Sequence, residues 1–147
     1  MNKNLTLFCL CGYFLFVLMP SFGFAQEFDP LVLEARAGKI IYGESDEIVL
    51  TIYLRNVSKD PIDIVEPAIN SRSLFVEINH PDKRADKLLA IQDNEPEIIS
   101  LASGKRLKFI ARFNPQMSGN YRINVRYSGF AGKTFEAAPI SIYVVKH

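Results

Sequence analysis

The sequence contains no tryptophan, only two cysteines and only two histidines in 147 residues. Cys9 and Cys11 both lie near the start, so the chain beyond them has no thiol for a disulfide or a metal site. His80 precedes a proline and His147 is terminal, and neither position suits the base of a Ser-His-Asp triad or a zinc site. We therefore expect no enzyme, no bound metal and no cofactor.

The chain also lacks a strong excess of charge. It carries 17 Lys plus Arg against 16 Asp plus Glu, a formal net charge of +1. A protein built to coat nucleic acid is normally much more basic, so we expect no nucleic-acid partner. Because 48% of the residues are hydrophobic, the chain can bury a core, and its length is that of one domain.

The first 25 residues have the pattern of a signal peptide. A single lysine precedes an apolar run over residues 5–19, which is too short to span a bilayer comfortably. Pro20 then breaks the helix, and Gly23 and Ala25 place small residues where signal peptidase requires them. We predict cleavage after Ala25 and export to a secreted or periplasmic location.

Two alternatives to cleavage involve the membrane. An uncleaved segment would serve as an N-terminal anchor, which Pro20 and the small residues before the predicted cut disfavour. Lipid attachment is disfavoured because Phe8 and Leu10, rather than small residues, precede the two cysteines. Cleavage leaves residues 26–147, which we expect to form a single domain without a disulfide.

Short segments of alternating polarity dominate residues 26–147, and no helical stripe of useful length occurs. Around residues 47–55, for example, Ile48, Leu50, Ile52 and Leu54 fall on one face of an expected strand. We expect strands at residues 31–35, 39–42, 47–55, 62–65, 74–78, 98–101, 107–113, 121–127 and 139–145. Residues 79–96 are expected to be a long loop with one short strand, and residues 39–42 to continue the first strand. The fold class is therefore all-β.

Residues 117–123 (MSGNYRI) resemble the tyrosine corner of immunoglobulin-like domains. In that motif a tyrosine near the start of strand F folds its hydroxyl back onto nearby backbone, and here Tyr121 takes that place. Residues 52–58 and 99–105 are also similar to segments of secreted immunoglobulin-like modules. The resemblance implies an immunoglobulin-like β-sandwich of seven to nine strands over residues 31–145.

The layout as a whole looks like the non-catalytic β-sandwich ahead of some secreted metallopeptidases. More loosely, it is similar to small bacterial protease-inhibitor sandwiches. The sequence departs from immunoglobulin domains proper because it lacks their cysteine pair and core tryptophan, and from the peptidase precursors because no HExxH motif occurs. Motifs of this kind specify architecture rather than activity.

Two loops are the candidate contacts for a protein partner. Phe130 lies between glycines in an expected hairpin tip, where an aromatic side chain can enter a partner's pocket or fold over the end of the core. The second loop, from Asn56 to Pro61, presents Ser58, Lys59 and Asp60, with Asn56 as the turn-forming residue. In an immunoglobulin-like sandwich both loops lie at the same end.

Basic residues supply a second candidate surface. Residues 26–100 hold 15 acids and 8 bases, whereas residues 101–147 hold 8 bases and one acid. Lys108, Arg112, Arg122 and Arg126 alternate with apolar residues and are expected on outward faces, where they would either attract an anionic partner or neutralise the acidic strands.

The sequence therefore predicts an exported, non-enzymatic module that binds a protein through its end loops, with protease inhibition as a special case. The alternative is a structural or assembly component of the cell envelope. In that alternative, an exposed edge strand at Pro139 to Val145 pairs with another chain.

Overall fold

The computed structural model describes residues 28–67, 73–88 and 97–146. The predicted signal peptide lies outside these residues. In the described part of the chain, no helix has the length and apolar character needed to cross a membrane.

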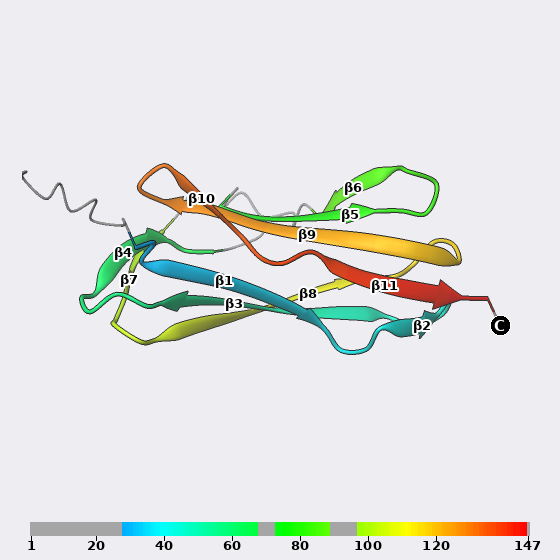
Figure 1. Ribbon diagram of the computed structural model, residues 1–147, viewed down its shortest axis with the longest axis horizontal. Coiled ribbons are helices and arrows are strands. Elements are labelled where there is room, and N and C mark those ends of the chain that lie inside the picture. The colour runs from blue at the N-terminus through cyan, green and yellow to red at the C-terminus, as the bar shows by residue number, and fades with distance from the viewer. Residues whose placement is uncertain (1–27, 68–72, 89–96, 147) are drawn as a thin grey trace, which may run out of the picture.

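The described residues form eleven strands in three sheets (Figure 1). These are β1 (Leu31–Ala37), β2 (Ile41–Gly43), β3 (Ile48–Asn56), β4 (Ile62–Val65), β5 (Leu74–Asn79), β6 (Ala85–Leu88), β7 (Ile98–Leu101), β8 (Arg106–Phe113), β9 (Gly119–Phe130), β10 (Lys133–Glu136) and β11 (Ile140–Val145). One sheet has the order β1-β3-β8 and a second has the order β2-β11-β9-β5-β6, with β10 also paired to β9. Strands β4 and β7 form a separate pair. The all-β sandwich predicted from the sequence is confirmed.

The core lies between the two larger sheets. Ile48, Leu50, Ile52 and Leu54 of β3 are completely buried, as their alternation predicts. The second sheet contributes its own alternating set, namely Val76 and Ile78 of β5, Tyr121, Ile123, Val125 and Tyr127 of β9, and Ile142 and Val144 of β11.

The eleven strands exceed the seven to nine expected for two reasons. Strand β2 is separate from β1, and β10 is an additional short strand; β6 is the one short strand expected within residues 79–96. Strand β2 does not continue β1; it crosses to the other sheet and pairs in parallel with β11, Ile41 opposite Tyr143. Strand β10 lies in a segment expected to be loop, and it follows the turn at Ala131 and Gly132.

The pairing of β2 also corrects the expected free edge at Pro139 to Val145. Tyr143, Val144 and Val145 are hydrogen-bonded neighbours of β2 on one side, and β9 pairs with residues 140–144 on the other. Over its second half β11 is therefore an interior strand, which has no open edge for another chain to join.

The sandwich presents two ends. At one end lie the loop between β3 and β4, the β9–β10 hairpin and the start of β1; at the other lie the β5–β6 hairpin and the β8–β9 connection (Figure 1). The two predicted partner loops thus share one end, because the Val57 amide donates to the Pro30 carbonyl and Lys133 lies 3.5 Å from Asp29.

Candidate functional site

Asn56 builds the loop that contains three of the predicted contact residues. Its buried side-chain amide donates to the carbonyls of Asp60 (2.8 Å) and Leu101 (2.9 Å). Its side-chain oxygen accepts from the amide and the hydroxyl of Ser58. The predicted role of Asn56 as the turn-forming residue is confirmed, and its bond to Leu101 ties this loop to the end of β7.

The three predicted contact residues of this loop, Ser58, Lys59 and Asp60, differ in whether their side chains are exposed or hydrogen-bonded within the loop. The Ser58 hydroxyl donates to the Asp60 carbonyl or to Asn56, and the Ser58 carbonyl accepts from the Ser103 hydroxyl, so Ser58 is part of the loop's own network. Lys59 and Asp60 have exposed side chains. They form the rim of this end of the molecule.

Phe130 is the last residue of β9 rather than the tip of the hairpin. The tip is formed by Ala131 and Gly132, both with positive φ angles (47° and 69°). The Phe130 ring is half-buried and lies 6.4 Å from the Phe135 ring, measured between centroids. Phe130 therefore packs against the end of the core and supports Phe135.

A groove of about 480 Å³ opens at this end of the sandwich. Its walls come from the start of β1, from the loop after β3 and from β10; the lining residues are Phe28, Asp29, Leu31, Val32, Leu33, Val57, Thr134, Phe135 and Glu136. Phe28 is 85% exposed and Val57 is 38% exposed, so two exposed hydrophobic side chains line the same groove. The groove lies between the two predicted loops, and Val57 belongs to the loop predicted at residues 56–61. Sequence reasoning did not single out Val57, and it missed Phe28, which precedes the first strand and shows no periodicity.

The four predicted basic surface residues do not form one patch. Lys108 and Arg112 lie on the outward face of β8, whereas Arg122 and Arg126 lie on the outward face of β9 in the opposite sheet. Arg112 is 2.7 Å from Glu47, which follows the expectation that some basic side chains meet acidic segments. Arg122 and Arg126 line a second, smaller groove of about 270 Å³ together with Glu77 and Glu136.

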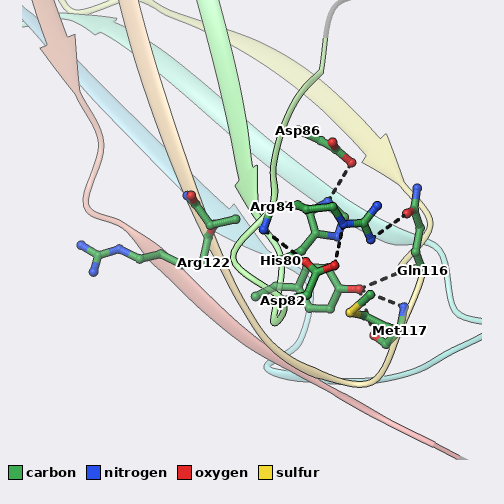
Figure 2. Close-up of polar contacts among 9 residues, drawn as sticks. His80, Asp82, Arg84, Asp86, Gln116, Met117 and Arg122 are labelled. Atoms are coloured by element: carbon green, nitrogen blue, oxygen red, sulfur yellow. Dashed lines mark hydrogen bonds and ion pairs between the residues drawn. The ribbon is translucent and has the colours of Figure 1, made fainter.

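The tyrosine corner is present at the other end of the sandwich. The Tyr121 hydroxyl donates to the Met117 carbonyl at 2.9 Å and accepts from the backbone amides of Gln116 and Met117 (Figure 2). Tyr121 is buried, and Ile123, two positions on, occupies the core position that the motif predicts. This contact pattern confirms the motif read from residues 117–123.

The turn of the β5–β6 hairpin packs against this corner. His80 is buried with its ring 5.1 Å from the Tyr121 ring, and its Nε2 lies 2.8 Å from Oδ2 of Asp86, although neither ring nitrogen makes a hydrogen bond of good geometry (Figure 2). Desolvation would raise the pKa of the Asp82 carboxyl, but hydrogen bonds from Arg84 and the charges of Arg84 and His80 lower it. These contacts stabilise the turn.

The described residues offer little for catalysis. His80 is the one histidine among them, and its ring is enclosed by the hairpin rather than open to a groove. No group of three or more His, Cys, Asp or Glu side chains gathers there in a way that could hold a metal ion. What the end groove offers instead is apolar surface with a polar rim, which suits binding.

Solved structures with the same fold are known. One is the CARDB domain of a Pyrococcus furiosus protein, in complex with di-metal ions; it is 16% identical, the match covers 81% of this chain and 90% of that one, and the TM-score is 0.50. Another is Spo0M, a sporulation control protein from Bacillus subtilis, which is 14% identical with a TM-score of 0.53; the match covers 82% of this chain and 51% of that one.

This chain shares the fold of these proteins. At such low identity the likeness concerns architecture alone. No family model matches the sequence, and no curated protein is similar enough in sequence to show a relationship. The narrower resemblance to the sandwich of secreted metallopeptidases remains a prediction.

Proposed function

We propose that this chain is an exported, non-enzymatic binding module that recognises a protein partner through the groove at the Asn56 end. The observation that carries the proposal is the groove itself, with exposed Phe28 and Val57 at its mouth. Exposed apolar side chains beside a concave surface are the usual anchors of protein recognition, because their burial on binding supplies most of the affinity.

The surroundings of the groove suit a protein partner better than a small ligand. Lys59, Asp60, Asp29 and Glu136 place charges of both signs around it, as in the polar rim of a protein interface. The loop that carries Val57 is held by the buried Asn56 network, so the surface is ordered before a partner arrives. Inhibition of a protease would be a special case of this binding.

A capture experiment with matched variants tests the groove. Residues 26–147 serve as bait on envelope and secreted fractions, beside a Phe28→Ala, Val57→Asp double variant. An Ile40→Ala, Ile41→Ala double variant is the control, because both residues are exposed and lie near the opposite end. Captured proteins are identified by mass spectrometry and their binding is measured again with purified components.

We expect the groove variant to lose its partner, with at least about a tenfold weaker Kd, while the control variant binds like wild type. A Phe130→Ala variant should lose less affinity, since Phe130 acts by supporting Phe135. Equal binding by the groove variant and wild type would contradict the proposal. A partner whose activity as a protease falls on binding would establish the inhibitor case.

Export is part of the proposal and has its own measurement. A full-length chain produced in its native host should appear in the periplasmic or secreted fraction with Gln26 as its first residue, as N-terminal peptide mapping would show. A membrane-bound chain that retains residues 1–25 would instead indicate the uncleaved anchor.

A further inference from the structure

Strand β8 is the edge strand of the three-stranded sheet. This edge takes no part in the groove proposed above. Among the described residues, β8 pairs with β3 on one side and with nothing on the other. The corresponding sheet of an immunoglobulin constant-type domain has four strands, with one more strand beyond the position of β8. Every second residue of β8 therefore directs its backbone N–H and C=O groups to a position that no described strand occupies.

The inward side of β8 is incompletely covered. Leu107, Phe109 and Phe113 pack against the core but remain partly exposed, whereas the inward residues of the neighbouring β3 are completely buried. Apolar side chains that face a core and yet reach solvent at a sheet edge gain free energy when a further strand covers them. The edge thus offers apolar contacts in addition to backbone hydrogen bonds.

The outward side of β8 is basic. Arg55 of β3 lies directly opposite Arg106, and Lys108 lies opposite Tyr53 in the next row. Like charges opposite each other on a sheet are destabilising. The Arg106 guanidinium lies over the Tyr53 ring, 4.7 Å from its centroid. No described carboxylate forms an ion pair with Arg55, Arg106 or Lys108, and the carboxylates of Glu34 and Glu47 pair with Arg36 and Arg112 instead. An anionic group next to this row would relieve the repulsion.

We propose that the open edge of β8 is a second docking site, which accepts an extended acidic segment of a partner protein as an added strand. Such a segment would place apolar residues beside Leu107 and Phe109 and acidic residues beside Arg106 and Lys108, since side chains of a strand alternate between faces. The site is separate from the end groove, and it places strand addition at β8 rather than at β11.

Charged residues on an edge strand can also protect it against unwanted pairing. The basic residues of β8 could therefore serve either protection of the edge or recruitment of an acidic strand, and the shape of the strand distinguishes these two roles. Proteins that protect an edge tend to keep it short or bulged. Strand β8 is eight residues long, its register with β3 runs without a break from Arg106 to Phe113, and Ile110 on its outward face is 47% exposed. These features favour use of the edge over protection of it.

Peptide titration tests the proposal directly. A blocked peptide of about nine residues, in which glutamate alternates with valine, is titrated into isotopically labelled residues 26–147 and followed by NMR. We expect chemical-shift changes centred on residues 106–113 that weaken in about 0.5 M salt, because exposed charge contacts are screened. A peptide with lysine in place of glutamate should bind at least about tenfold more weakly.

Two controls separate strand addition from simple charge attraction. Charge reversal at Arg106→Glu with Lys108→Glu should weaken binding by at least about tenfold, whereas Arg122→Glu with Arg126→Glu, on the opposite sheet, should leave binding unchanged. N-methylation of alternate peptide amides should abolish binding, because it removes the backbone donors. Shift changes away from β8, equal effects of the two charge reversals, or undiminished binding of the methylated peptide would each overturn the proposal.

Discussion

Buried polar side chains hold both ends of the sandwich in place. The Asn56 side chain donates two hydrogen bonds and accepts two. Three of them lie within the β3–β4 loop, and the one donated to the Leu101 carbonyl joins this loop to the end of β7. Tyr121 joins the start of β9 to the backbone before it. Each of these groups is buried with its hydrogen bonds made, which is the condition under which a buried polar group stabilises rather than destabilises a fold.

Removing the Tyr121 hydroxyl should therefore be costly. Tyr121→Phe leaves the Met117 carbonyl and two backbone amides without their partner, and we expect the free energy of unfolding to fall by about 1–3 kcal/mol. Urea denaturation measures this change. The matched control is Tyr143→Phe, at an exposed tyrosine, which should change the stability by less than about 0.5 kcal/mol. Equal effects of the two substitutions would contradict a stabilising tyrosine corner.

Tyr127 should give the protein an alkaline dependence of stability. Its hydroxyl donates to the Val65 carbonyl at 2.6 Å, and burial raises its pKa above the ordinary value of 10.0. In the unfolded chain the phenol loses its proton near pH 10, whereas in the folded chain it stays protonated. The free energy of unfolding must then fall as the pH rises above about 10, because the unfolded state binds fewer protons.

Comparison with Tyr127→Phe isolates this effect. The variant should lose about 1 kcal/mol at neutral pH through the missing hydrogen bond, and its stability should fall less steeply than that of wild type between about pH 9 and about pH 11. Urea denaturation across this pH range is the measurement. Parallel stability curves for the two proteins would show that Tyr127 does not carry the alkaline dependence.

At the scale of secondary-structure elements, close approach between β9 and the β5–β6 turn requires a glycine. Gly119 begins β9 with a φ angle of +127°, and a Cβ atom at this position would lie 2.8 Å from the Pro81 ring. A side chain there would meet both an unfavourable backbone conformation and a proline that cannot swing aside. Gly119 therefore allows the hairpin to pack closely on the start of β9, beside the contact between the His80 and Tyr121 rings.

A matched pair of glycine substitutions tests this close packing. Gly104 also has a positive φ angle, +70°, but nothing lies within 4 Å of the position of its Cβ. We expect Gly119→Ala to lower the free energy of unfolding by at least about 2 kcal/mol more than Gly104→Ala, since only the former adds a clash to the backbone strain. Thermal unfolding of both variants measures the difference, and similar losses would mean that backbone strain alone matters.

At the scale of the whole molecule, one core joins the two sheets, so they should unfold together. Ile52→Ala removes a completely buried side chain and should cost about 2–5 kcal/mol. Thr51→Ala, next to it on the outward face, should cost much less. Far-ultraviolet circular dichroism and tyrosine fluorescence should report one coincident transition in each variant. Separate transitions by the two probes would show that the sheets unfold independently.

Some features of the molecule could be predicted from local sequence because they depend on local geometry. The alternation of apolar and polar residues predicted that Ile48, Leu50, Ile52 and Leu54 share one buried face. Residues 117–123 predicted the tyrosine corner, whose hydrogen bonds join residues only four or five positions apart. The candidate site was predicted less well. Its two loops were predicted, and one of them contains Val57, but neither the exposure of Val57 nor the part played by Phe28 was, because exposure depends on which distant segments surround a residue.

The amino-acid sequence by itself determined the all-β class, most strand positions, the inward and outward residues of each long strand and the lack of a disulfide within residues 26–147. Only the tertiary structure decided which strands are neighbours. It moved β2 to the side of β11, left β8 at the edge of its sheet among the described strands and separated Lys108 from Arg122 onto opposite faces. The physical reason is that the face of a residue follows from the backbone of its own strand, whereas the partner of a strand follows from long-range hydrogen bonds and packing that no short segment encodes.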